Sequence, residues 1–326
     1  MVTSTSIITA SATTDLDLTR PETDYNDVQA AVYNILGNGS GQSGYGRAVL
    51  SAPAVVGNDV YAFRLASLKV DILKCAYHQG IAATSEIASI PTISEGEDIR
   101  AADINFFIAA ASAITTNKFL LGAGQYSDEN LLAPGGLPIT STRTTAWGSA
   151  TKTTINHAFT VDFGSSDNAR YFFNSGSSIR FSGNFDYTLN TPQNRAWDRL
   201  MAFIGTVVFN YSSTSSNGGG TGSSIGFYDL TNSPQQVFTA SGSGTYVVAA
   251  YGSNNYEIRV SCDAVNNSTG GARYLYVNIL FHDYHSNINS DQVVGSLTSS
   301  VAIRRASGFY VNVPPPSATN TVLLSA

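Results

Sequence analysis

The first half of the chain carries hydrophobic residues at helical spacing. In residues 23–37 apolar side chains recur every three to four positions, which predicts an amphipathic helix that ends at Gly37. The same pattern predicts a second helix from about residue 62 to 79 and a third from about residue 101 to 116. We therefore expect a small helical docking domain over residues 19–125.

From residue 146 onward the pattern changes to that of strands. Residues 256–262, YEIRVSC, alternate between apolar and polar, so one face should pack and the other should meet water. Residues 273–282, RYLYVNILFH, are apolar on both faces, which favours a central strand or one covered at an interface. Short strands separated by Gly, Asn and Ser are typical of a sandwich. The other strands are expected near residues 158–163, 169–173, 179–186, 205–210, 225–230, 245–250, 297–303 and 308–313.

Three further segments complete the predicted organisation. Residues 1–18 are rich in Ser and Thr and lack periodicity, which predicts an extended arm. Residues 126–145 are rich in Gly, Pro, Ser and Thr, which predicts a linker. Residues 195–205 carry apolar side chains at helical spacing and should form a helix that closes one end or face of the sandwich. The expected fold is α+β: a small N-terminal helical domain followed by an antiparallel β-sandwich over residues 146–326, with one short helical insert.

One stretch of the β domain, ARYFFNSGSSIRFS at residues 169–182, combines aromatic runs with a break of Asn, Gly and Ser. The break has turn chemistry, because Asn and Gly tolerate a positive φ and Ser bonds to its own backbone. We therefore predict a β-hairpin here, with Arg170 on one strand and Arg180 on the other. Its function could be that of a ligand platform, an active-site wall or part of an assembly.

Composition narrows the classes of function. Charged residues make up 12% of the 326 residues, the net charge is −6, and the basic residues are scattered. Nucleic-acid binding needs a local basic footprint, so we do not expect a nucleic-acid partner. The low charge and the 29 glycines, together with many Ser, Thr and Asn residues, suit a β-rich and turn-rich structure.

The N-terminal residues and the cysteines indicate where the protein is made. No Lys or Arg precedes Arg20 and there is no continuous apolar core, so a secretory signal is not expected. No apolar run approaches the roughly 18–20 residues of a membrane span. Cys75 and Cys262 lie far apart without metal-type spacing. We expect a soluble protein of cytosolic synthesis whose two thiols are reduced and buried.

Two short motifs resemble catalytic or cofactor signatures in the wrong context. GSGQSG at residues 39–44 matches G-x-G-x-x-G, but it follows a predicted helix instead of a strand, which favours a flexible helix exit. GSSIG at residues 222–226 centres on Ser224, but it lies in a Gly/Ser tract and is followed by strand-like residues. We interpret this second segment as a long mobile loop with a potential contact surface.

The histidines and carboxylates do not form a recognisable set. His282 and His285 lie three residues apart, so in an extended strand they point to opposite faces and cannot share a metal without a bend. His78 and His157 have no partner at metal-binding spacing. A glycosidase would need two carboxylates across a cleft, and nothing in the sequence pairs those nearest the aromatic stretch. These acids are Asp162, Asp167, Asp186 and Asp198. We therefore predict no catalytic residues, no metal site and no cofactor.

Arginine and tyrosine residues of the β domain are the candidates for subunit contacts, because Arg and aromatic residues are enriched at interfaces. The alternative is that the arginines face solvent and their stems cover neighbouring aromatic rings. The candidates are Arg170, Arg180, Arg304, Arg305, Tyr274 and Tyr276.

Several segments together resemble virion structural proteins of tailed bacteriophages, most strongly those of contractile-tailed phages, including cyanophages, of the tail, baseplate or neck. The segments are SGYGRAVLSAPAVVGNDV, YHQG, ARYFFNSGSSIRFS, RAWDRLMAFIGTV and DQVVGSLTSSVAIRRASG. The resemblance covers residues 18 to 310 approximately, and the aromatic stretch with the Trp-containing helix after it is its most specific part. It implies a structural subunit of the virion, made in the host cytoplasm, present in several symmetric copies, without catalytic activity or cofactor.

Three hypotheses of function follow. In the first, the helical domain docks onto other virion proteins, the β-sandwich projects or packs between subunits, and the protein forms a trimer or hexamer. In the second, the β domain is a tail-fibre module that binds a host-surface glycan through exposed aromatics and the loop at residues 212–224. In the third, the protein is an enzyme that acts on such a glycan.

Overall fold

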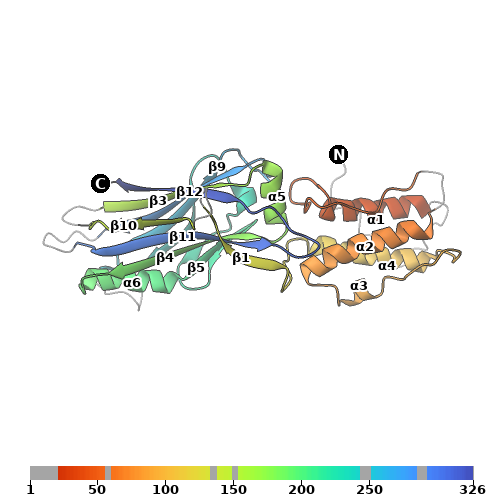
Figure 1. Cartoon of the computed structure of the whole chain (residues 1–326), viewed down its shortest axis with the longest axis horizontal. Coiled ribbons are helices and arrows are strands. Elements are labelled where there is room, and N and C mark those ends of the chain that lie inside the picture. Colours follow the sequence, from red (N-terminus) through yellow and green to blue (C-terminus); the bar gives the residue numbers. More distant parts are fainter. Residues whose placement is uncertain are drawn as a thin grey trace. The chain divides into compact units, whose positions relative to one another are not determined.

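The computed structural model describes residues 21–55, 60–132, 138–148, 153–242, 251–284 and 292–325 (Figure 1). The chain divides into two compact units. The helical unit contains the described residues up to Ser127 together with Arg170–Gly176 and Ala306–Val313. The sandwich unit contains the remaining described residues from Asp128 onward. Two short segments of the second half of the chain therefore belong to the helical unit.

The helical unit confirms the three predicted helices and adds a short one. Its helices are α1 (Pro21–Leu36), α2 (Ala62–Gln79), α3 (Ser85–Ala88) and α4 (Ala101–Thr116). Helices α1, α2 and α4 pack against one another. Their inward faces are fully or almost fully buried and include Val32, Ile35, Leu68, Ile72, Phe107 and Ile114. The apolar stripes at helical spacing are thus the core of this unit.

The sandwich unit consists of two antiparallel six-stranded sheets. The first has the order β1–β11–β4–β5–β6, and β2 also pairs with β11. The bounds are β1 (Tyr126–Asn130), β2 (Thr140–Arg143), β4 (Ser178–Tyr187), β5 (Thr206–Phe209), β6 (Thr214–Ser216) and β11 (Gly295–Ala306). The second has the order β12–β3–β10–β9–β8–β7. Its bounds are β3 (Thr153–Asp162), β7 (Thr221–Gly222), β8 (Gln235–Ser241), β9 (Asn255–Cys262), β10 (Tyr274–Asp283) and β12 (Ser317–Ser325). The predicted α+β fold with a β-sandwich is confirmed.

The core of the sandwich lies between the sheets and is closed by a helix. Apolar side chains alternate inward along β3 and β10, and His157 on β3 bonds through Nδ1 to the hydroxyl of Ser299 on β11 at 2.8 Å. Helix α6 (Pro192–Ile204) contacts β4 of one sheet and β8 of the other. A Cβ at Gly183 would lie only 2.6 Å from the sulfur of Met201, so α6 approaches β4 closely at this glycine. The predicted helical insert is confirmed.

The aromatic stretch is not a hairpin. Residues 166–174 form helix α5 (Ser166–Asn174), and only the second run becomes a strand, β4, which pairs with β11 and β5. The hydroxyl of Ser165 accepts a hydrogen bond from the Asn168 amide at 3.1 Å, which caps the helix start. Ala169 and Phe172 fall on one buried helical face. The predicted strand at 169–173 was therefore wrong.

Five other segments differ from the prediction or lie outside the described residues. Residues 126–145, predicted as a linker, contain β1 and β2 of the first sheet. Residues 225–230 contain a 3-10 turn, η1 (Phe227–Asp229), in place of the expected strand. Residues 308–313, also expected to be a strand, contribute one isolated bridge from Asn312 to Ser307. The expected arm at 1–18 and the expected strand at 245–250 lie outside the described residues.

Candidate functional site

Arg170, the first of the interface candidates, is buried inside the helical unit. Its side chain is on α5, and the residue is 7% exposed. The guanidinium donates to the backbone carbonyls of Asn38 at 3.1 Å and of Gly41 and Ser43 at 3.3 Å. Arg170 therefore holds the loop after α1 and lies inside the helical unit, not at a surface where a subunit could contact it.

The loop that Arg170 holds is the glycine motif of residues 39–44. Gly39 and Gly44 have φ of 52° and 103°, in the left-handed region that favours glycine. The amide of Asn174 at the end of α5 donates to the carbonyls of Gly41 and Gly44 at 3.2 and 3.3 Å. The carbonyls of the loop thus point toward side chains of α5. The motif has a structural explanation that involves no phosphate, and the loop does follow a helix, as expected.

Three other candidate arginines form ion pairs with the neighbouring strand β1. Arg304 binds both carboxylate oxygens of Asp128, at 2.8 and 3.0 Å, and Arg180 lies 3.4 Å from the same carboxylate. Arg305 binds both oxygens of Glu129 at 3.0 and 2.7 Å. The hydrogen bond from Arg304 is the main cause that lowers the pKa of Asp128 below its usual range. These arginines are half-buried at the surface of the first sheet, and their role between subunits stays a prediction.

The outer face of β10, called here the β10 face, carries the two tyrosine candidates. It comprises the outward-pointing side chains of β10, which are Tyr274, Tyr276, Asn278, Leu280 and His282. The rings of Tyr274 and Tyr276 are nearly parallel, with an interplanar angle of 10° and centroids 6.5 Å apart. Tyr276 is exposed, and in register it lies beside Thr160 of β3 and Ser261 of β9. Since β10 is an interior strand, its prediction as a central strand is confirmed.

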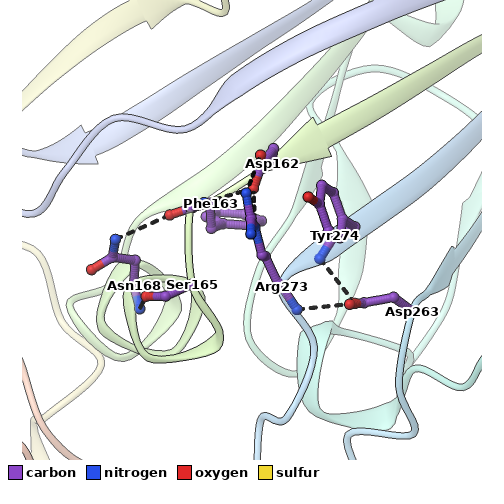
Figure 2. A network of polar contacts seen from close by, with 8 residues as sticks. Asp162, Phe163, Ser165, Asn168, Asp263, Arg273 and Tyr274 are labelled. Carbon is purple, nitrogen blue, oxygen red and sulfur yellow. Dashed lines mark hydrogen bonds and ion pairs between the residues drawn. The ribbon is translucent and has the colours of Figure 1, made fainter.

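A polar network fixes the start of the β10 face, as Figure 2 shows. The guanidinium of Arg273 binds both oxygens of Asp162 at 2.7 and 2.8 Å and lies over the Tyr274 ring, 4.7 Å from its centroid. The backbone N–H groups of Arg273 and Tyr274 both donate to Asp263 at 2.9 Å. The hydrogen bond from Arg273 lowers the pKa of Asp162 below its usual range. Asp162 is thus an anchoring carboxylate. Sequence reasoning missed Arg273 and Asp263, which no spacing rule connects to Asp162.

The other end of the β10 face carries a histidine and a buried acid. His282 lies 3.2 Å from Glu257 through Nε2 and 3.0 Å from the Thr154 hydroxyl through Nδ1. Glu257 is buried on the outer side of β9, where it also binds Arg259 at 2.5 Å. The outer face of β9 is therefore less exposed to solvent than the alternation of apolar and polar residues predicted. Asp283 points to the opposite side, into the core, where it accepts from Gln193 at 2.8 Å.

In the part of the chain that the structure describes, the histidine and serine motifs form neither a metal site nor a nucleophile elbow. His285 lies outside the described residues, and the described histidines, cysteines and acids form no group of three that could hold a metal. Ser224 is followed by the turn η1, not by the helix that a nucleophile elbow requires. The segment expected to be a mobile loop contains β6 and β7, and the backbones of Thr214 and Ser223 bond each other at 2.9 and 3.1 Å.

Buried titratable groups occur in both units, and their pKa values reflect that burial. Desolvation lowers the pKa of His78 and of His157 to about 4, so both imidazoles are neutral at pH 7. Burial raises the pKa of the Cys262 thiol to about 11 and raises that of Cys75 further. Both cysteines are free and buried, as predicted. Neither thiol has the lowered pKa of a nucleophile.

An exposed row of apolar side chains in the helical unit lies along α2. Phe63, Val70 and Tyr77 are exposed and fall seven residues apart, on the side of α2 opposite its buried stripe. The ring of Tyr61 stacks on Phe63 at 5.9 Å, and that of Tyr310 stacks on Tyr77 at 5.6 Å. Phe309 is 93% exposed and its ring meets the Tyr310 ring edge-on at 5.0 Å. We call these six residues the α2 ridge. Its seven-residue spacing is visible in the sequence, but we did not predict it.

Comparisons with known proteins do not assign the chain. No family model matches it, and no curated protein or solved structure matches it either. No helix in the described ranges is long and apolar enough to cross a membrane, as expected.

Proposed function

We propose that this protein is a non-enzymatic structural subunit of a phage virion, in the tail, tail-fibre or neck region, that assembles as a symmetric homo-oligomer. The observation that carries the proposal is the α2 ridge, in which Phe63, Val70 and Tyr77 form an exposed row on one helix and Tyr61, Tyr310 and Phe309 extend it through ring contacts. The resemblance of several sequence segments to virion proteins supports the same reading. The trimer or hexamer expected from the sequence remains part of the proposal.

The composition of the α2 ridge is that of a protein contact. Its members are Tyr61, Phe63, Val70, Tyr77, Tyr310 and Phe309. Interface cores are enriched in Tyr and Phe and depleted of Lys and Glu. Two nearby cations are occupied: Lys69 donates to the Ile90 carbonyl at 2.8 Å, and Lys74 binds Asp71 at 2.8 Å. A neighbouring subunit that covers the ridge would remove these aromatic rings from water, at roughly 25 cal/mol per Å² of apolar surface.

The geometry of the polar groups supports a structural role over a hydrolytic one. A general acid needs a carboxyl whose pKa is raised toward neutrality. Asp162 and Asp128 instead have lowered pKa values because arginines hold them. These carboxylates are suited to fixing strands in place.

The association state of the whole chain tests the proposal. Light scattering over a range of concentrations should give a mass that is a multiple of the chain mass of 34.4 kDa. The double variant Val70→Asp, Tyr77→Ser should shift this mass toward that of the monomer by placing a charge and a gap in the ridge. Tyr33→Ser is the matched control, because Tyr33 is exposed on α1 and outside the ridge. A wild-type chain that stays monomeric at every concentration would contradict the proposal.

A second candidate function, recognition of a host-surface glycan, is favoured by the β10 face. The parallel rings of Tyr274 and Tyr276 present aromatic surface on which the apolar side of a sugar ring can stack, and Arg273 beside them carries donors. Glycan-array binding by the full chain, lost in Tyr276→Ala and retained in Tyr33→Ala, would favour this function. Absence of binding to any glycan would count against it.

A further inference from the structure

The edges of the two sheets differ greatly in length and charge. β12 forms one edge of its sheet with nine residues, and β7 forms the other with two. In the first sheet the edge strand β6 has three residues. At the opposite edge, next to β11, β1 has five residues, which include Asp128 and Glu129, and β2 has four, which include Arg143. Among the described strands, β12 is therefore the one long and uncharged edge.

β12 lacks most of the features by which proteins protect an edge from pairing with another chain, although its first half is contacted by β2, where the Asn320 side-chain amide donates to the Thr140 carbonyl and to the Ser141 hydroxyl. Such features are Lys residues, prolines, bulges and very short strands. The strand reads SATNTVLLS, without charge, Pro or Gly, and its register with β3 runs without a shift from Ser317 to Ser325. Its middle is open to solvent, since Thr321 and Val322 are exposed and Leu323 is 55% exposed.

The hydrogen bonds show which backbone groups of β12 point away from β3. The Ala318 N–H donates at 3.3 Å to the carbonyl of Leu132, a residue outside β3. In an antiparallel pair the residues that bond the neighbour alternate with those that point away. The N–H and C=O groups of Asn320, Val322 and Leu324 therefore also point outward. No described residue bonds these outward backbone groups.

We propose that β12 pairs with β12 of a second copy of the chain, antiparallel and about a twofold axis. The proposal rests on the proposed function, because it names one contact of the homo-oligomer. Val322 would lie opposite Val322 of the second copy, and Asn320 opposite Leu324. This register uses all three outward residues, with two N–H···O bonds at each of three residue pairs. The two six-stranded sheets would then continue into one another.

A second copy fits this edge better than other occupants do. A strand that pairs along β12 must itself be a long open edge that brings no unpaired charge to Val322 and Leu323. β12 meets this condition, whereas β1 carries two acids and β6 and β7 are too short. Self-pairing of one strand is isologous and closes at two copies. Of the two expected assemblies this contact is compatible with the hexamer and not with the trimer, and a hexamer then needs a further threefold contact elsewhere on the chain. The other occupant to test is the segment 1–18 of the same chain.

The first test uses Val322→Pro and Val322→Lys in the full chain, with light scattering over a dilution series. The proline removes an N–H that points away from β3, so the sheet itself should keep its circular dichroism and thermal midpoint. The lysine places two like charges opposite each other. Each variant should weaken the association at this contact at least tenfold. Thr160→Lys, with the same charge on the interior strand β3, is the control and should leave the association unchanged.

The second test checks the register by cross-linking and does not depend on weakened folding. Val322→Cys should form a disulfide-linked dimer under mild oxidation, because the two residues oppose each other about 5.5 Å apart between Cα atoms, within disulfide range. Leu323→Cys should cross-link far less, since its opposite residue is Thr321. The native thiols Cys75 and Cys262 are buried and should not contribute.

The outcomes separate this inference from the proposed function. A wild-type oligomer that Val322→Pro and Val322→Lys leave intact overturns the β12 pairing and leaves the assembly proposal standing. A wild-type chain that is monomeric at all concentrations overturns both. A larger mass after deletion of residues 1–18 that Val322→Lys abolishes in the truncated chain would mean that this segment covers β12 in the full chain, which also overturns the pairing.

Discussion

The two units of this protein differ in the kinds of side chain at their surfaces. The helical unit exposes many large apolar side chains: Tyr33, Leu50, Val55, Tyr61, Phe63, Val70, Tyr77, Phe106, Leu120 and Phe309. Among the described residues the sandwich unit exposes seven such side chains against ten. It also carries ion pairs along its strands, of Arg304 with Asp128, Arg305 with Glu129 and Arg273 with Asp162. Exposed apolar patches mark contact sites, whereas exposed ion pairs are compatible with water. The difference supports the proposal above, in which the helical unit carries the principal docking surface and the sandwich makes contact at its β12 edge.

The contrast extends to single arginines. Arg170 is enclosed in the helical unit and bonds backbone carbonyls, while Arg304 lies at the sandwich surface and bonds a carboxylate. Both were interface candidates from the sequence because residue type alone cannot distinguish them. Their energetic roles should differ by several-fold, since buried polar groups lose far more than exposed ones when a partner is removed.

The largest expected effect is on the stability of the helical unit in Arg170→Leu. The carbonyls of Asn38, Gly41 and Ser43 would each lose the guanidinium donor, and Gly41 would keep the bond from Asn174. The variant no longer has to bury a charged guanidinium, which offsets part of this loss. We therefore expect the free energy of unfolding to fall by about 2–4 kcal/mol. Arg304→Leu should cost less than about 1 kcal/mol. Urea unfolding followed by circular dichroism at 222 nm, which reports mainly the helices, measures the first effect.

Arg170→Lys is the conservative control for this comparison. It keeps the positive charge but lacks the planar fork that reaches several carbonyls, so its loss of stability should lie between those of wild type and Arg170→Leu. Equal losses for Arg170→Leu and Arg304→Leu would show that the buried arginine has no special structural role.

The second expected effect is a loss of stability in acid that occurs in both units. The folded pKa of His78 and of His157 is about 4, below the value of about 6.5 for an unfolded histidine. The unfolded chain therefore binds protons first, and the stability contributed by each neutral imidazole is complete above pH 6.5. It is lost as the pH falls from about 6.5 to about 4, by a few kcal/mol at most for each group.

Two optical probes separate the units in this experiment. Both tryptophans of the chain, Trp147 and Trp197, lie in the sandwich unit, so fluorescence reports that unit and the pH dependence due to His157. Circular dichroism at 222 nm reports mainly the helical unit and His78. His157→Gln should flatten the pH dependence seen by fluorescence, and His78→Gln should flatten that seen by circular dichroism. If neither variant changed the pH dependence of stability, the protonation of His78 and His157 would not be its cause.

The sequence predicted those parts of the fold whose pattern is local. The stripe of Leu65, Leu68 and Ile72 and the strand at β9 depend on neighbouring residues, and both elements were found as expected, although Glu257 and Ser261 on the outer face of β9 are buried. Strands β1 and β2 were missed because they are short and polar and pair with β11, more than 150 residues later in the chain.

Helix α5 shows a different reason for failure. The aromatic run at residues 171–173 is compatible with a strand as well as with a helix, so its periodicity cannot distinguish the two. In the folded protein Arg170 and Asn174 lie one turn apart and both reach the loop at residues 38–44, about 130 residues earlier. That contact is long-range and leaves no signature in the local pattern. Residue type alone selected the candidate residues, and their surroundings required the structure.

The smallest expected effect concerns the polar network at the start of the β10 face. In Arg273→Leu the carboxylate of Asp162 loses a two-point partner, so its pKa should rise toward its ordinary value, as NMR titration of the side-chain carboxyl would show. The pair is exposed to solvent, so the thermal midpoint should hardly change. Arg195→Leu, on α6, removes an exposed arginine bound to Asn190 and should leave the Asp162 pKa unchanged. Arg273→Leu and Arg170→Leu could also lower the stability of the sandwich and of the helical unit by equal amounts. Surface ion pairs would then stabilise the protein as much as buried hydrogen bonds do, which would contradict the comparison of the two units.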